Sequence, residues 1–178
     1  MQASEEKFTK FISGEVTFVI PVYQRNYDWR QVDCDRLFSD ILNIIINSKP
    51  HFIGTFVYTY DPAVGAPQEY IIIDGQQRIT SIILFAKALY DLTEETDLKE
   101  DIRSKFIKHT TGRGLKNKCR LRPTEYDRAT FEKLMSDDVF DEKNFTIQEK
   151  SSALYRNYDF FRKKFLLHLK RKKNFVMQ

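Results

Sequence analysis

An abrupt change of hydrophobic pattern at residues 69–92 constrains the fold more than any other feature of this 178-residue chain. The stretch 69–74 includes three consecutive isoleucines without polar alternation, which indicates a central strand covered on both faces. From Ile79 onward the apolar residues recur every three or four positions, which predicts a buried helix that ends near Leu92. Only Asp-Gly-Gln-Gln-Arg, residues 74–78, separates the two patterns. The chain must therefore pass directly from a core strand into a core helix.

Similar patterns predict the remaining elements of the fold. β-Branched and aromatic residues indicate strands at residues 16–20 and 52–60, with a shorter edge strand at 119–122. A Pro- and Gly-rich turn at residues 61–67 favours a hairpin between the strands on either side of it. Helical periodicity marks the segments 4–12, 32–47, 102–108, 124–134 and 147–170. We therefore expect an α+β fold, with a small mixed β-sheet packed by helices and a mainly helical C-terminal part.

Length and composition favour one domain outside the membrane. With 42% hydrophobic residues the chain can bury a single core, which we divide into residues 1–92 and a helical extension at 93–178 of the same domain. No apolar run approaches the roughly 20 residues that cross a bilayer, and no signal peptide is visible, so we expect a cytoplasmic protein. Cys34 and Cys119 lack neighbouring metal ligands and are expected to be free thiols. The basic C-terminus lacks helix stop signals, so we expect further domains to follow.

The strand-to-helix junction is the first candidate site. The start of the helix leaves the backbone N–H groups of Gln76, Gln77 and Arg78 free, and such an end attracts anions. Gly75 allows a ligand to approach the backbone, and Arg78 can hold phosphate oxygens in a bidentate fork. Asp74 could hold Mg²⁺, orient a water molecule or simply cap the helix. Nucleotide or phosphate binding and ordinary helix capping both fit this pattern.

A loop at residues 22–29, directly after Pro21, is the second candidate site. Gln24 and Arg25 offer hydrogen-bond donors, and Tyr23, Tyr27 and Trp29 offer faces on which a base or a guanidinium could stack. The alternative is that these aromatic residues fill the core and that Arg25 pairs with Asp28 or Asp74. The loop alone does not decide between the two readings.

The order of three motifs strengthens the functional interpretation. They are Ile-Pro-Val-Tyr-Gln-Arg-Asn-Tyr-Asp-Trp at residues 20–29, Phe-Ile-Gly at 52–54 and Asp-Gly-Gln-Gln-Arg-Ile-Thr at 74–80. Together they resemble the N-terminal domain of the GmrSD-type modification-dependent restriction endonucleases. Ile79 and Ser81 depart from the Leu and Thr of the family pattern, and neither change should alter phosphate chemistry. The specific motifs lie within residues 1–92, and the resemblance is looser beyond them.

This resemblance implies a ParB/sulfiredoxin-like fold that binds a nucleoside triphosphate with Mg²⁺ and hydrolyses it. It implies catalytic roles for Asp74, Gln76, Gln77 and Arg78, with Asp74 also the candidate metal ligand. It implies nucleotide-binding roles for Gln24, Arg25, Gly75, Gln77, Arg78 and Thr80. From the chemistry of the loop we expect Tyr23 and Tyr27 to be the stacking residues. The resemblance also implies an HNH-type nuclease domain, in the same chain or a partner subunit, which this module licenses to restrict foreign DNA.

Two other functions remain open at this point. The domain could bind DNA or sense its modification without hydrolysis, through basic residues concentrated at 103–128 and after Arg162. It could also be a ParB-like nuclease itself, although His51, His109 and His168 are scattered and no compact carboxylate cluster suits two metal ions. Sulfiredoxin-type chemistry would need a cysteine at the phosphate-binding turn, where this chain has none.

Overall fold

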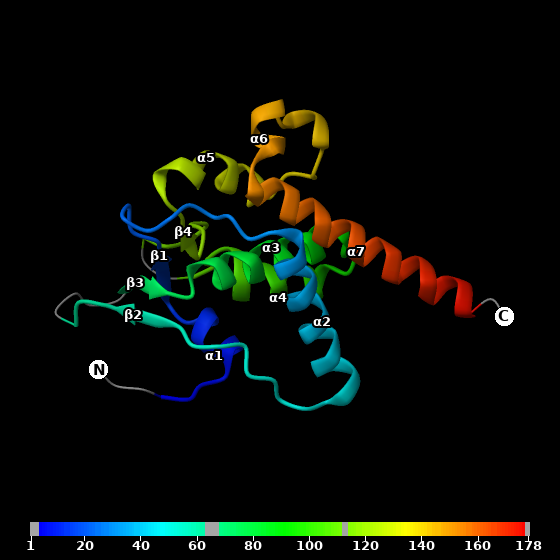
Figure 1. Cartoon of the computed structure of the whole chain (residues 1–178), viewed down its shortest axis with the longest axis horizontal. Coiled ribbons are helices and arrows are strands. Elements are labelled where there is room, and N and C mark those ends of the chain that lie inside the picture. The colour runs from blue at the N-terminus through cyan, green and yellow to red at the C-terminus, as the bar shows by residue number, and fades with distance from the viewer. Residues whose placement is uncertain (1–3, 63–67, 112–113, 177–178) are drawn as a thin grey trace.

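The strands form a mixed β-sheet at one side of the molecule in the computed structural model, which describes residues 4–62, 68–111 and 114–176 (Figure 1). Within these ranges the sheet has the strand order β2-β3-β1-β4. β1 is parallel to both β3 and β4, and β2 is antiparallel to β3. The strands are β1 (Val16–Val19), β2 (Val57–Thr59), β3 (Gln68–Asp74) and β4 (Leu121–Arg122). The small mixed sheet and the hairpin are therefore confirmed, although residues 63–67 of the turn lie outside the described ranges.

The helices surround α3, which leads directly out of β3 and packs against the long C-terminal helix α7. Figure 1 shows that α7 crosses the molecule and that its C-terminal half extends past the other helices. None of the helices in the described ranges is long and apolar enough to cross a bilayer. The helices are α1 (Phe8–Ser13), α2 (Gln31–Asn47), α3 (Gln76–Leu92), α4 (Thr96–Ile102), the π-helix η1 (Arg103–Ile107), α5 (Glu125–Leu134), the 3₁₀-helix η2 (Glu142–Asn144), α6 (Ile147–Ser151) and α7 (Ala153–Val176).

α3 is the central helix of the core, as the sequence predicts. Ile79, Leu84 and Ala88 are fully buried, and most of the polar residues on α3 are buried as well, among them Lys87. The ammonium group of Lys87 lies 2.7 Å from a carboxylate oxygen of Asp91 and donates to the Ser136 carbonyl. The Tyr158 hydroxyl of α7 donates to the same carboxylate. A buried polar network therefore joins α3 to α7.

One prediction about β3 is wrong. β3 is an inner strand, as expected, but it is not covered on both faces. Ile72 is fully buried, whereas the next residue, Ile73, is 47% exposed. Because successive side chains of a strand point to opposite faces, one face of β3 packs on the core and the other is open to solvent here.

Several helix boundaries also differ from the prediction. α1 begins at Phe8 rather than at residue 4, and α4 begins at Thr96, before the helix predicted at residues 102–108. The predicted last helix is divided into α6 and α7 at Ser152, whose hydroxyl accepts from the Tyr155 amide at 3.2 Å. Strand 52–60 is paired only at residues 57–59. Local hydrogen bonds therefore set boundaries that hydrophobic periodicity does not show.

Candidate functional site

The N-terminus of α3 is uncapped by any side chain. Gly75 occupies the N-cap position with φ of 97°, which favours glycine. A Cβ at this position would lie 2.7 Å from the Phe56 ring, so the close packing of Phe56 also requires glycine. The first turn of the helix leaves backbone N–H groups without partners inside the helix. The predicted anion-attracting end is thus present, with one side covered by Phe56.

Arg78 lies on this first turn and reaches across to the segment before β2. Its guanidinium donates to the Thr55 carbonyl at 3.2 Å and lies 5.6 Å from the centre of the Phe56 ring. Gly54, with φ of 101°, makes room for it, because a Cβ there would be 2.4 Å from the Nη1 atom. Within the described ranges no carboxylate forms an ion pair with Arg78. Its positive charge is therefore available to an anion.

Asp74, Gln76 and Gln24 form the other edge of the junction. Asp74 is exposed and its carboxylate accepts from the Gly75 amide at 2.8 Å. The Gln76 amide donates to Gln24, which in turn donates to the Ile73 carbonyl, both at 2.9 Å. The described residues contain no group of three or more His, Cys, Asp or Glu side chains that could hold a metal ion. Asp74 is accordingly a single carboxylate ligand at most.

The Gln77 and Thr80 side chains make hydrogen bonds within the protein. The Gln77 side chain is buried, donates to the Asn26 carbonyl and accepts from the Asp28 amide, each at 3.0 Å. The buried Thr80 hydroxyl donates to the Gln76 carbonyl at 2.8 Å. Gln77 therefore positions the loop at residues 22–29 against α3, and these hydrogen bonds of both side chains are made within the protein.

Tyr27 is a core residue, which corrects its expected stacking role. The ring is 7% exposed, so a base could not stack on it without displacing core side chains. Its hydroxyl lies 2.6 Å from the Ser81 hydroxyl and accepts from Asn157 of α7 at 3.0 Å. Burial raises the pKa of this phenol well above its usual value, and burial raises the pKa of the neighbouring Cys34 thiol to about 11. Both groups therefore remain neutral at physiological pH.

The two remaining predicted residues of the loop face solvent. Tyr23 is 74% exposed. Arg25 pairs with Asp28 at 3.2 Å, which is one of the two partners considered from the sequence. This ion pair is itself exposed, so the Arg25 guanidinium is held only weakly. Arg25 follows Gln24, which bonds to the junction, but Arg25 does not line the cavity next to Arg78.

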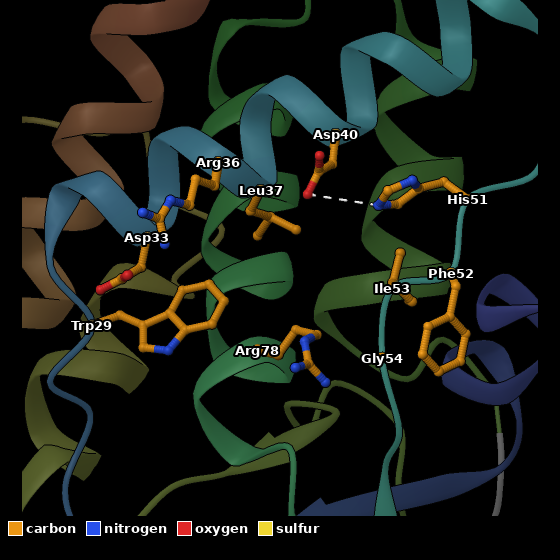
Figure 2. Close-up of a pocket in the computed structure, with 10 residues that line it drawn as sticks. All are labelled: Trp29, Asp33, Arg36, Leu37, Asp40, His51, Phe52, Ile53, Gly54 and Arg78. Carbon is orange, nitrogen blue, oxygen red and sulfur yellow. Dashed lines mark ion pairs between the residues drawn. The ribbon is translucent and has the colours of Figure 1, made fainter.

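A cavity of about 320 Å³ opens beside Arg78, between the first half of α2 and residues 51–54 (Figure 2). Trp29, Leu37 and Ile53 contribute apolar surface to it. Figure 2 shows Trp29 and Arg78 flanking the space from two different segments. Its lining residues are Trp29, Asp33, Arg36, Leu37, Asp40, His51, Phe52, Ile53, Gly54 and Arg78. Of these, the sequence indicates Arg78 as a site residue, Trp29 as one of three aromatic residues that could stack on a base, and Phe52, Ile53 and Gly54 as part of a motif; it does not indicate Asp33, Arg36, Leu37, Asp40 or His51.

Comparison with protein-family models decides the relationship that the motifs suggest. The model of the GmrSD restriction endonuclease N-terminal domain matches residues 6–177. The chain belongs to this family. The match continues through α7, well past the motifs of the first 92 residues, so the GmrSD N-terminal domain includes the C-terminal helices. A search of curated proteins finds no match. Membership makes the chain part of a GmrSD restriction system.

Proposed function

We propose that this GmrSD N-terminal domain binds a nucleoside triphosphate at the start of α3 and so regulates the nuclease of its restriction system. The observation that supports this proposal is Arg78, a residue of the uncapped first turn of α3 whose guanidinium has no carboxylate partner in the described ranges. A helix N-terminus and an arginine fork both favour phosphate oxygens. Gln24 and Gln76 lie at the same turn and can exchange their mutual hydrogen bond for bonds to a ligand.

Magnesium fits this arrangement through Asp74. Mg²⁺ is usually held in nucleotide sites by one or two carboxylates together with the phosphates, and Asp74 supplies one exposed carboxylate. When bound, the ion would neutralise charge on the phosphates. Arg78 would stabilise phosphate charge directly, and Asp74 would orient the water that hydrolyses the nucleotide. Arg25 can reach the phosphates only by leaving its weak pair with Asp28.

The regulatory part of the proposal depends on how the loop at residues 22–29 is held. Gln77 of α3 bonds this loop on one side, and the Asp127 carboxylate of α5 accepts from the Tyr27 amide at 2.7 Å. Asn157 of α7 donates to the Trp29 carbonyl at 2.7 Å. A ligand that shifts Gln24 or Gln76 would therefore move a loop bonded to α5 and α7. Such a loop connects the nucleotide site to α5 and α7.

The test is a calorimetric titration of the domain with nucleoside triphosphates and Mg²⁺. Replacing Arg78 by Ala should weaken the best nucleotide by about 10- to 100-fold, the loss typical of a charge-assisted hydrogen-bonded pair. Arg122→Ala is the matched control, because Arg122 pairs with Glu69 on the sheet and does not approach α3. Absence of nucleotide binding by the wild type, or equal binding by Arg78→Ala, would contradict the proposal.

Direct DNA binding is a second candidate function, favoured by the charge of α7. Residues 162–176 include seven Lys and Arg and no Asp or Glu, and four of the seven, at 170–173, belong to the C-terminal half of α7, which extends past the other helices. Neutralising phosphates with such residues releases counterions, so affinity for duplex DNA should fall steeply between 50 and 200 mM salt. Changing Lys170, Arg171, Lys172 and Lys173 to Gln should reduce both the affinity and this salt dependence. No retention on DNA at low salt would exclude the function.

A further inference from the structure

We infer that the cavity beside Arg78 is the subsite for the nucleoside, in which the base stacks on Trp29 while the phosphates lie on the Arg78 side. This inference rests on the proposed function and adds the recognition of the base to it. The cavity volume of about 320 Å³ is at the lower end of the range for small-molecule sites, which is about 300–1,000 Å³. The space is therefore suited to a group of the size of a nucleoside.

Trp29 is well placed to act as a stacking wall. It lies in the cavity lining, and its main chain is fixed because its carbonyl accepts from the Asn157 amide. Leu37 of α2 and Ile53 provide apolar surface around the same space (Figure 2). Stacking of a base on an aromatic side chain contributes about 1–3 kcal/mol, whichever base is present. A rigid indole beside aliphatic side chains is the surface that this contact requires.

Arg78 connects the cavity to the phosphate site. Its side chain lines the cavity while its backbone belongs to the first turn of α3. Gly54 makes room for the guanidinium, because a side chain at this position would overlap with it. Arg78 thus joins the cavity to the helix start, and a nucleotide in this position would contact both.

The polar edge of the cavity can bind a sugar or the hydrogen-bonding edge of a base. Asp40 lies 3.7 Å from His51 in a half-exposed pair, and its carboxylate can accept from ribose hydroxyls or base N–H groups. Asp33 caps α2 and lies 3.6 Å from Arg30, so its carboxylate is less available to a ligand than that of Asp40. Arg36 adds an exposed guanidinium to the same rim. This edge combines hydrogen-bond acceptors with a cation, as expected for a nucleoside rather than for a purely apolar ligand.

The experiment uses the fluorescence of Trp29, which is the only tryptophan of the chain. Wild-type domain is titrated with ATP, GTP, CTP and UTP in Mg²⁺, and separately with inorganic tripolyphosphate, while calorimetry measures binding. A stacked base should quench the indole emission in a saturable way. Tripolyphosphate should bind through Arg78 and leave the emission unchanged.

Variants separate the base contact from the phosphate contact. Trp29→Ala should weaken the best nucleotide by about fivefold to 100-fold and leave the affinity for tripolyphosphate unchanged. Trp29→Phe should restore much of the lost nucleotide affinity. Thermal unfolding of each variant checks that its fold is intact. Tyr126→Ala, at an exposed aromatic residue of α5 outside the cavity, is the control.

Two results would overturn the inference in different ways. If nucleotides bind Trp29→Ala as tightly as the wild type, or bind the wild type without quenching, the base lies elsewhere and the proposed function survives. If neither nucleotide nor tripolyphosphate binds the wild type, the proposed function fails, and the nucleoside subsite fails with it.

Discussion

Replacing Asp91 by Ala is expected to lower the free energy of unfolding by about 3–5 kcal/mol, because the change leaves the buried Lys87 charge without its partner. The Lys87 and Asp91 side chains are 2% and 6% exposed and lie 2.7 Å apart. The Tyr158 hydroxyl loses its acceptor in the same variant. Urea unfolding followed by circular dichroism measures the loss. Asp101→Ala is the control, since Asp101 forms a similar pair with Lys105 on the surface and should cost about 0–1 kcal/mol.

The pH dependence of this variant tests the mechanism. Burial lowers the pKa of Lys87 and the Asp91 charge opposes that shift, so removal of Asp91 should lower the pKa further. Between the lowered value and the unfolded value of about 10.4, the unfolded state binds more protons than the folded state. Stability of Asp91→Ala should therefore rise with pH in this window and approach that of the wild type. If the difference in free energy of unfolding between Asp91→Ala and the wild type does not change with pH, the buried Lys87 charge is not the cause of the destabilisation.

Replacing Gln77 by Ala should lower the free energy of unfolding by about 2–4 kcal/mol. The change leaves the Asn26 carbonyl and the Asp28 amide without partners, and each unsatisfied group costs about 1–3 kcal/mol. Hydrogen exchange gives a local readout. Exchange at the Asp28 amide should accelerate, whereas the Tyr27 amide, which donates to Asp127, should keep more of its protection.

Two further variants define the role of Gln77 in the site. Gln148→Ala, at an exposed position on α6, is the control and should change stability little. Gln76→Ala removes only the bond to Gln24, which keeps its own bond to the Ile73 carbonyl, so its cost should be smaller than that of Gln77→Ala. Equal losses for the two variants would mean that Gln77 does not position the loop.

The sequence predicts the elements whose hydrophobic pattern is long and regular. α3 is the clearest example, because its apolar period and the preceding Asp-Gly pair locate both the helix and its start. The prediction for Ile73 is wrong because three consecutive isoleucines do not reveal whether a helix covers the second face of the strand. The start of α6 has a visible signal in the capping box of Thr146 and Glu149, whereas the division between α6 and α7 lies at Ser152, which accepts from the Tyr155 amide. Local capping patterns therefore locate helix boundaries better than periodicity alone.

The candidate site is only partly predictable, for a different reason. The sequence identifies Arg78 and Gly75 from the chemistry of a helix start, and the structure places both at that turn. It does not distinguish Tyr27, which packs in the core, from Trp29 two residues later, which lines the cavity. Which aromatic residue of a loop faces solvent depends on contacts with distant helices such as α7, here made by Asn157. Such contacts leave no pattern in the loop itself.

The strand order has a consequence for how the domain is made. β1 lies between β3 and β4, so one of its two neighbours comes from residues 121–122. A nascent chain leaves the ribosome N-terminus first and can pair β1 with β3. The other edge of β1 stays unpaired until β4 has emerged. Open strand edges invite pairing with other chains. A shortened gene product that stops near residue 92 would keep that edge permanently exposed, and we expect it to aggregate when it is expressed.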